Sequence, residues 1–429
     1  MKLAIFEDEF SDNLNPLALT KPVYALRCGP SLLYEKALRE FPSADVYLFM
    51  RDLLVETFAV KMTHKDRVRV RGINDLKALE GDDVLFVNGR WLVNKSLIAE
   101  DEEIVAVKDD VVVYAYLKKE SIRKALETSR KIEEVLNWAR REIGEKRLDE
   151  ALMIKYPWDL VNHNSEEIKR EFAKFKEKEG ILPSMVKGLD VVGDEGDVFI
   201  ARNAKIYPNV VFDTSHGPVI VDEGAIVYSF SIIFGPSYIG KDSWIIGGRI
   251  REGTTIGPVC RVSGEVEESI IHGYSNKYHE GFIGHSYIGE WVNLGALTTT
   301  SDLRNDYRNI KVYINGRAVD TRSIKVGSFI GDHTKIGIGT LLNTGTIIGV
   351  MCNIASSGTV PPKYIPSFIW YVKGQMSEGP GLEYMIETAR IAMSRRNIRL
   401  TEAEAKLFRK LHEKTREERE KILNDYKSR

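Results

Sequence analysis

Three polar residues near the middle of this 429-residue chain have the types of side chain that proton transfer on an anionic substrate requires. His279 can take up a proton near neutral pH, where an unperturbed imidazole titrates. Arg249, thirty positions earlier, has a planar guanidinium that can hold a phosphate through two parallel hydrogen bonds. Asn293, fourteen positions after His279, can position a ligand with its amide. His285 follows in the same stretch and is a rival for the base.

A repeat of six residues surrounds these positions. An aliphatic residue returns at every sixth place, at Ile324, Ile330, Ile336, Leu342, Ile348 and Ile354, and the pattern extends back, with slips of phase, to Ile200. This period is typical of a parallel β-helix, in which a short strand buries its aliphatic residue and a glycine or another small residue turns the corner. Because one repeat cannot cover its own apolar face, the stacked repeats form the core. An antiparallel β-domain with scattered Ile-Gly pairs is the alternative.

The solenoid also offers structural explanations for the polar residues. A histidine can simply lie at an exposed corner, and an arginine can be a solvated charge in a ladder of surface side chains. Two interruptions break the repeat, at residues 213–218 and, with many charged residues, at 300–323. A long loop inside a solenoid usually serves a site or an interface, because it adds polar groups without disturbing the repeat.

The first part of the chain has a different pattern. Short apolar runs, expected as strands at residues 3–6, 46–49, 84–87, 104–107 and 111–116, alternate with helical patterns such as residues 31–41. This alternation predicts an α/β domain with a largely parallel sheet. We therefore expect three parts: an α/β domain at 1–190, a β-helix at 191–360 and a helical extension at 361–429 that caps or braces the solenoid.

Composition restricts the classes of protein. The chain has 61 basic and 62 acidic residues, so no overall charge attracts nucleic acid or an anionic membrane. Cys28, Cys260 and Cys352 are isolated, which favours a reducing compartment and argues against a zinc knuckle. The acidic turn after Phe6 does not fit a signal peptide, and no apolar run reaches about 18 residues. We expect a cytoplasmic protein.

The segments 248–258, 277–284 and 288–296 resemble the acetyltransferase half of the bifunctional bacterial enzymes that make UDP-N-acetylglucosamine, and the whole chain is most similar to the divergent branch of that family. The resemblance implies a left-handed β-helix and a homotrimer with sites between subunits. It implies that His279 is the general base, that Arg249 holds the sugar phosphate, and that Phe282 and Asn293 contact the substrate. Glu267 stands where the family has a substrate-binding lysine.

The same resemblance implies acetyl-CoA as co-substrate. The positions of the family's acyl-CoA contacts fall on Ala296, Asp332 and Val350, and Asp332 replaces a serine there. The acceptor implied is an amino-sugar 1-phosphate of the glucosamine-1-phosphate type.

The N-terminal part resembles sugar-phosphate nucleotidyltransferases, with UTP and Mg²⁺ as the implied nucleotide and metal. Their glycine-rich phosphate loop is missing, since residues 7–15 contain no glycine, and Lys21 or Arg27 are the candidate cations for the pyrophosphate. Asn88-Gly89-Arg90 stands where the family has a metal-binding aspartate. The metal ligands stay unknown, with four carboxylates as candidates: Asp8, Asp109, Asp110 and Asp159.

Two other readings are open. The N-terminal domain can be a non-catalytic module that binds a sugar nucleotide for regulation or bracing, which the missing glycine loop favours. The second is a γ-class carbonic anhydrase, a trimeric β-helix with zinc between histidines, for which His272, His279 and His285 are the candidates.

Overall fold

The computed structural model describes residues 1–62, 69–98, 102–356 and 358–427. Contacts between residues divide the chain into two compact units. Unit 1 contains Met1–Leu14, Thr20–Leu26 and Ser31–Lys155, and unit 2 contains Asn15–Leu19, Arg27–Pro30 and Tyr156–Arg429. In the part of the chain that the structure describes, we find no helix long and apolar enough to cross a membrane.

Unit 1 is built on a seven-stranded sheet in the order β5-β4-β1-β6-β8-β7-β9. Its strands are β1 (Lys2–Phe6), β4 (Asp45–Phe49), β5 (Val70–Ile73), β6 (Val84–Asn88), β7 (Ile104–Lys108), β8 (Val111–Leu117) and β9 (Glu145–Arg147). The half from β5 to β6 is parallel, as the alternation of strands and helices predicted, whereas β8 runs antiparallel to both β6 and β7. The chain reaches β8 from β7 through a tight turn, Asp109-Asp110, which permits only antiparallel pairing.

Helices flank this sheet and bury its apolar side chains. They are α1 (Leu33–Glu40), α2 (Asp52–Lys61), α4 (Lys119–Thr128) and α5 (Ile132–Glu142), with short 3₁₀ turns η1 (Glu9–Leu14), η2 (Val23–Ala25), η3 (Lys77–Leu79) and η4 (Lys95–Leu97) and the short strand β3 (Ser31–Leu32). Phe86, Ala115 and Leu117 of the sheet share one core with Ile122, Val135 and Ala139 of α4 and α5. The helix expected at residues 31–41 is α1.

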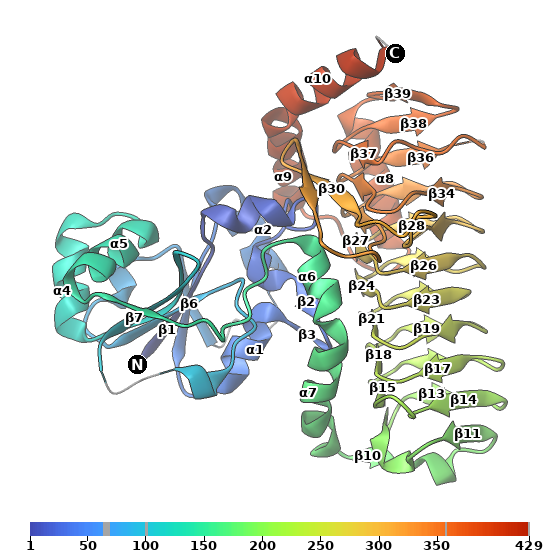
Figure 1. The fold of residues 1–429 in the computed structure, drawn as a ribbon, viewed down its shortest axis with the longest axis horizontal. Helices are drawn as coiled ribbons and strands as arrows, with labels where there is room; N and C mark the ends of the chain where they lie inside the picture. Colours follow the sequence, from blue (N-terminus) through green and yellow to red (C-terminus); the bar gives the residue numbers. More distant parts are fainter. Residues whose placement is uncertain (63–68, 99–101, 357, 428–429) are drawn as a thin grey trace. The chain divides into compact units, whose positions relative to one another are not determined.

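Unit 2 contains the solenoid, whose successive coils stack along one axis (Figure 1). Each coil places one strand in each of three sheets, which we name A, B and C in the order in which the chain visits them. Sheet A consists of β10 (Gly180–Ile181), β12 (Val198–Ala201), β15 (Val219–Val221), β18 (Ser237–Ile239), β21 (Thr254–Ile256), β24 (Ile270–Gly273), β27 (Tyr287–Glu290), β32 (Phe329–Ile330), β35 (Ile347–Ile348) and β37 (Tyr364–Ile365).

Sheet B consists of β13 (Lys205–Ile206), β16 (Ile226–Val227), β19 (Trp244–Ile245), β22 (Arg261–Val262), β25 (Asn276–Lys277), β28 (Asn293–Leu294), β33 (Lys335–Ile336), β36 (Asn353–Ala355), β38 (Trp370–Val372) and β39 (Gln375–Ser377). Sheet C consists of β11 (Leu189–Val192), β14 (Val210–Asp213), β17 (Ile232–Phe234), β20 (Arg249–Ile250), β23 (Glu265–Glu267) and β26 (Phe282–Gly284). On the same side, β29 (Thr299–Thr300) pairs with β34 (Leu341–Leu342).

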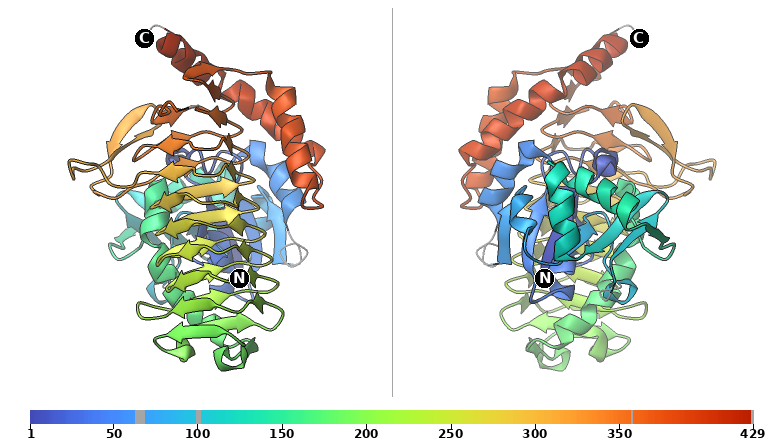
Figure 2. Two further views of the ribbon diagram at one scale, coloured as in Figure 1. Left: turned by 90° about the vertical axis from the view of Figure 1, so that its right-hand side faces the viewer. Right: turned by 90° about the vertical axis from the view of Figure 1, so that its left-hand side faces the viewer.

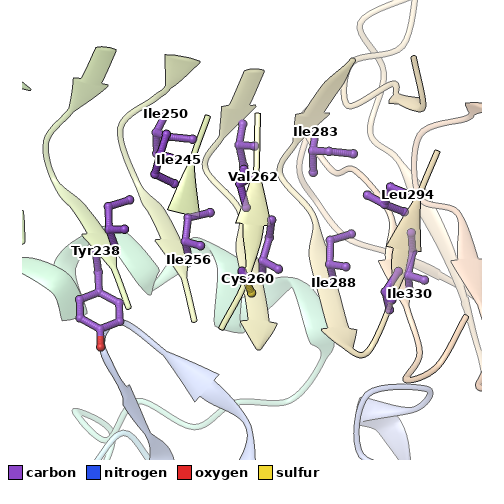
Figure 3. Close-up of a cluster of buried hydrophobic side chains, with 14 of the residues drawn as sticks. Tyr238, Ile245, Ile250, Ile256, Cys260, Val262, Ile283, Ile288, Leu294 and Ile330 are labelled. Atoms are coloured by element: carbon purple, nitrogen blue, oxygen red, sulfur yellow. The ribbon is translucent and has the colours of Figure 1, made fainter. Parts of the chain in front are cut away.

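The aliphatic residues of the hexads from Ile330 to Ile354 point into the solenoid, whereas Ile324, which we expected to begin this series, is exposed at the end of the long interruption. Ile245, Ile250 and Ile256 lie on three consecutive strands, which belong to sheets B, C and A, and their side chains meet in the interior of the solenoid (Figure 3). The structure therefore confirms the predicted class: a nucleotidyltransferase-like α/β domain, a β-helix and C-terminal helices. The repeat runs further than expected, because Ile365, Ile369 and Tyr371 add to the core beyond Ile354.

The first helices of unit 2 belong to the solenoid and not to the α/β domain. These are α6 (Pro157–Asn162) and α7 (Asn164–Lys176), followed by the 3₁₀ turns η5 (Pro183–Met185) and η6 (Glu195–Asp197). Phe172 and Phe175 of α7 are buried in the solenoid core. Asn164 donates from Nδ2 to the carbonyl oxygen of Gly253, at 2.7 Å. The division between the units therefore falls after Lys155, whereas we expected it at residue 190.

The C-terminal helices lie along the last coils (Figure 2). They are α8 (Leu382–Ser394), α9 (Glu402–Lys414) and α10 (Arg416–Lys427). After α8, Arg396 donates to Oδ1 of Asn276 on sheet B, at 2.7 Å, and Leu423 of α10 is part of the solenoid core. The long interruption of the repeat forms a hairpin of β30 (Lys311–Ile314) and β31 (Arg317–Asp320), and the remaining short strand of unit 2 is β2 (Arg27–Cys28).

Candidate functional site

Arg249 lies on the outer surface of sheet C. It is the register partner of Glu265 on the next coil, and Glu265 is the partner of Phe282 on the coil after that. Ile250, the residue after Arg249, points inward and is fully buried, so Arg249 must point outward. Its side chain is 50% exposed, and its Nη2 lies 3.3 Å from Oε2 of Glu265. A guanidinium in this position is accessible to a phosphate.

His279 lies in the loop from β25 to β26, at the corner between sheets B and C. It is exposed, and its ring meets the edge of the Tyr278 ring at 5.2 Å between centroids. Arg249 begins its strand directly after the same corner two coils earlier. Asn293 is an exposed residue of sheet B, on the strand that leads into that corner on the next coil. The structure therefore brings Arg249, His279 and Asn293 to one edge of the solenoid.

His285 lies at the opposite end of β26, at the corner between sheets C and A. Its Nδ1 is 2.8 Å from Oδ2 of Asp302, and the two side chains are only 13% and 14% exposed. Burial alone would raise the pKa of Asp302, but the hydrogen bond and charge of His285 outweigh it and lower the pKa. A histidine that is oriented by a carboxylate is the arrangement that activates many catalytic bases.

Asp302 was missed in the sequence because it begins the long interruption. It could have been found from the repeat itself. One coil of the solenoid takes 17 residues here, from Ile271 to Ile288, and the same step from His285 leads to Asp302.

His272 lies in β24 of sheet A, close to the third corner, between sheets A and B. It is buried, and its Nδ1 is 2.8 Å from the hydroxyl oxygen of Tyr287. The three histidines therefore occupy three different corners and do not converge within one chain. Among the described residues, no group of three His, Cys, Asp or Glu side chains could hold a metal ion. This geometry does not support the carbonic anhydrase alternative.

The expected acyl-CoA contacts are not brought together. Ala296 lies at the corner between sheets B and C, whereas Asp332 and Val350 lie at the corner between sheets A and B. Asp332 and Val350 are both buried. Oδ1 of Asp332 accepts a hydrogen bond from the backbone N–H of Glu290 at 2.7 Å. Asp332 and Val350 are thus buried turn residues of the solenoid, and within a single chain they lie at a different corner from Ala296.

Glu267 stands outward on sheet C and faces a lysine from the long interruption. Nζ of Lys325 lies 3.7 Å from Oε1 of Glu267. Lys325 is held there by a bridge to Leu303, at the base of the β30–β31 hairpin. The interruption therefore adds a cation beside the residue that replaces the family's lysine.

In unit 1, the residues that follow β1 are tied to two arginines. Glu7 accepts hydrogen bonds from Arg51 and from the backbone N–H of Val23, at 2.9 Å for the latter. Oδ1 of Asp8 accepts from Nε of Arg90 at 2.8 Å, and its Oδ2 accepts from Nδ2 of Asn88 at 2.8 Å. Arg90 is buried. A buried arginine and an asparagine thus surround the carboxylate at the carboxyl ends of β1 and β6.

The other metal candidates also have partners. Asp109 pairs with Lys155, Asp110 pairs with Arg140, and Asp159 accepts the backbone N–H of Tyr156 at 2.9 Å. The described residues therefore do not fit a metal site built from protein carboxylates.

Lys21 and Arg27 belong to different units, Lys21 to unit 1 and Arg27 to unit 2. Arg27 is buried, its Nε donates to the carbonyl oxygen of His272 at 3.2 Å, and its Nη1 donates to the carbonyl oxygen of Pro30. Its backbone N–H donates to the hydroxyl of Tyr287 at 2.9 Å. This guanidinium braces the solenoid, so of the two cations only Lys21 stays a candidate for the pyrophosphate.

Comparisons with known proteins agree with this architecture. Residues 3–179 match the family described as sugar nucleotidyl transferase. A bifunctional sugar-1-phosphate nucleotidylyltransferase/acetyltransferase of Sulfurisphaera tokodaii is 25% identical over 401 residues, which cover 84% of this chain and 97% of that protein. The bifunctional protein GlmU of Methanocaldococcus jannaschii is 36% identical over 165 residues, or 36% of this chain and 37% of that protein. The GlmU of Methanococcus aeolicus is 29% identical over 190 residues, or 40% of this chain and 46% of that protein. Over most of its length, this chain is therefore similar to a transferase that joins a sugar-1-phosphate nucleotidylyltransferase to an acetyltransferase, and its first 179 residues match the sugar nucleotidyl transferase family from residue 3 onward.

Proposed function

We propose that the solenoid transfers the acetyl group of acetyl-CoA to the amine of an amino-sugar 1-phosphate of the glucosamine-1-phosphate type. The observation that supports this most is the meeting of Arg249, His279 and Asn293 at one edge of the solenoid. A cation for the phosphate, a base for the amine and an amide for positioning are the groups that this reaction requires.

In the proposed reaction, the imidazole of His279 takes a proton from the substrate amine as its nitrogen attacks the thioester carbonyl. The carbon–sulfur bond breaks, the CoA thiolate leaves and takes up a proton, and the sugar keeps the new amide bond. Arg249 contacts the phosphate before and during the reaction, so it contributes to binding more than to the rate of the chemical step.

We further propose that the protein is a homotrimer through the solenoid. Arg249, His279 and Asn293 are exposed in the single chain, and partly exposed apolar residues, Ile232 and Phe234, lie beside Arg249 on sheet C. A site that needs to exclude water from its substrate is better formed against a second copy of this surface. A monomeric mass in light scattering at micromolar concentration would exclude this assembly.

For unit 1 we propose transfer of a uridylyl group from UTP to the N-acetylated sugar 1-phosphate, with release of pyrophosphate. The family to which residues 3–179 are matched supports this activity. Lys21 is the candidate cation for the pyrophosphate, and we assign no ligand for Mg²⁺. Lys21→Ala should then lower formation of the UDP-sugar by orders of magnitude, because loss of a cation that stabilises developing charge is costly.

A second candidate for unit 1 is a non-catalytic module that binds a sugar nucleotide. The ion pair of Asp8 with the buried Arg90 favours it, because it neutralises the carboxylate next to which a metal would bind. In that case the chain acetylates its substrate but forms no UDP-sugar.

One experiment tests both units. The purified chain is incubated with glucosamine 1-phosphate and acetyl-CoA, and separately with N-acetylglucosamine 1-phosphate, UTP and Mg²⁺. We expect free CoA thiol in the first mixture and pyrophosphate in the second. Thiol without pyrophosphate would favour the non-catalytic module, and absence of thiol with a panel of amino-sugar phosphates would overturn the acetyltransferase proposal.

A further inference from the structure

One position in the solenoid interior carries a lysine where the repeat places aliphatic residues. The strands of sheet B contribute an inward column of register partners: Val227, Ile245, Val262 and then Lys277. On the following coils Leu294 and Ile336 occupy the same column. Lys277 is only 3% exposed. The hexad pattern therefore breaks at this one place, two residues before His279.

The side chain of Lys277 reaches the corner between sheets B and C and bonds to the backbone there. Its Nζ donates to the carbonyl oxygen of Ser263 at 2.8 Å and to that of His279 at 3.0 Å. No carboxylate in the described part of the chain forms an ion pair with it. The ammonium thus connects the loop that carries His279 to the same corner of the preceding coil.

Gly264 makes room for this ammonium. A Cβ on Gly264 would lie 2.5 Å from Nζ of Lys277 and 2.7 Å from the carbonyl oxygen of Gly281, so a larger residue there would displace one of them. The carbonyl oxygen of Gly264 accepts the backbone N–H of Arg249 at 2.8 Å, and that of Gly281 accepts the N–H of Glu265 at 3.0 Å. Lys277 therefore sits where the coil of Arg249 and the loop of His279 are joined.

Stability of the core does not explain a lysine at this place. An ammonium removed from water loses its hydration, and two carbonyl oxygens compensate for only part of that loss. The same burial lowers the pKa of Lys277 to about 8. A leucine would restore the hexad, as Leu294 does one coil later. A residue that costs stability is commonly retained because a function needs it.

We propose that Lys277 is a positioning residue for the acetyl-transfer site, which fixes the loop of His279 in place relative to Arg249. This inference rests on the function proposed above.

The test is Lys277→Leu, with Lys277→Met as a second variant in case leucine does not fold. We expect an unchanged or higher melting temperature together with a kcat for acetyl transfer lowered about 10- to 100-fold, because a misplaced base loses much of its effect. Ile245→Leu, in the same column two coils earlier, is the matched control and should change neither property.

A second readout does not depend on activity. The rate at which diethyl pyrocarbonate modifies His279, followed by mass spectrometry, reports the accessibility of its imidazole. We expect this rate to change in both Lys277 variants, because the loop of His279 loses its hydrogen bond to the ammonium, and to stay unchanged in Ile245→Leu. If the modification rate of His279 and the rate of acetyl transfer in the Lys277 variants both equal those of the unsubstituted chain, the inference is wrong. This holds even if His279→Ala abolishes transfer. If His279→Ala retains full transfer, the proposed function itself has the wrong base, while the modification profile still decides the role of Lys277.

Discussion

Alanine variants of the two corner histidines should have opposite effects on rate and on stability. His279 is exposed, so its removal should change the free energy of unfolding by less than about 0.5 kcal/mol. If it is the general base, the same change should lower acetyl transfer by about 10²- to 10⁴-fold. The KM for the sugar phosphate should stay nearly the same, because the guanidinium of Arg249 is untouched.

His285→Ala should instead destabilise the solenoid. It leaves the carboxylate of Asp302, only 14% exposed, without its 2.8 Å partner. Loss of a hydrogen bond to a charged group costs about 1.5–3 kcal/mol. For a domain of 150–250 residues, each kcal/mol shifts the melting temperature by about 2–4 °C, so a fall of roughly 3–12 °C is expected. Acetyl transfer below the melting temperature should be almost unchanged.

The pair also predicts a dependence on pH. Because the pKa of Asp302 is lowered in the folded chain, its contribution to stability is present above the pKa of the unfolded chain and is lost as the pH falls through the lower, folded value. Asp302→Asn should therefore flatten the loss of stability below about pH 4, near the ordinary pKa of an aspartate.

Both properties are measured on the same preparations. Release of the CoA thiol gives kcat and KM, and circular dichroism gives the melting temperature. If His285→Ala abolishes transfer in a chain that remains folded, while His279→Ala keeps most of it, then the base is the His285–Asp302 pair and the reasoning from one shared edge is wrong.

Three further predictions concern other parts of the solenoid unit. Arg249→Ala should raise the KM for the sugar phosphate about 10- to 100-fold at nearly constant kcat, since loss of a charge-assisted contact costs about 1.5–3 kcal/mol; an unchanged KM would remove Arg249 from the site. Burial lowers the pKa of Lys335 to about 7, so its positive charge should destabilise the fold most below pH 7. Lys335→Met should therefore raise the melting temperature below pH 7, by an amount that shrinks toward pH 10. A difference in melting temperature that stays constant across pH would contradict this prediction. Deletion of residues 383–429 should lower the melting temperature without removing the strand signal in circular dichroism, because most of the interior is formed by the coils themselves; complete unfolding would show that α8–α10 are needed for the core.

Much of the fold was predictable because the repeat is local. The six-residue spacing of Ile330, Ile336 and Leu342 states which residues point inward, and the structure buries all three. The boundary of the units was not predictable in the same way. Helix α7 is amphipathic in the sequence, but nothing in it states which core receives Phe172 and Phe175.

The candidate site, like the fold, was predictable from the sequence only in part. The types and spacing of Arg249, His279 and Asn293 could be read from the chain, and the corner geometry of the solenoid then brings them to one edge. The spacing of residues in the sequence gave no means to judge the expected roles of Arg27, Asp332 and Val350. Only tertiary packing shows that Arg27 donates to backbone carbonyl oxygens. It also shows that Asp332 and Val350 are buried, at a different corner of the solenoid from Ala296.

The sequence alone thus determined the periodic core and the types of side chain available for chemistry, since both depend on short-range order along the chain. Only the tertiary structure decided which charges are neutralised. Asp8 and Arg90 are 82 positions apart in the sequence, and they pair because separate strands of the sheet lie next to each other. Lys277 shows the same division, because its place in the hexad is visible in the sequence, whereas its bonds to Ser263 and His279 depend on how two coils meet at a corner.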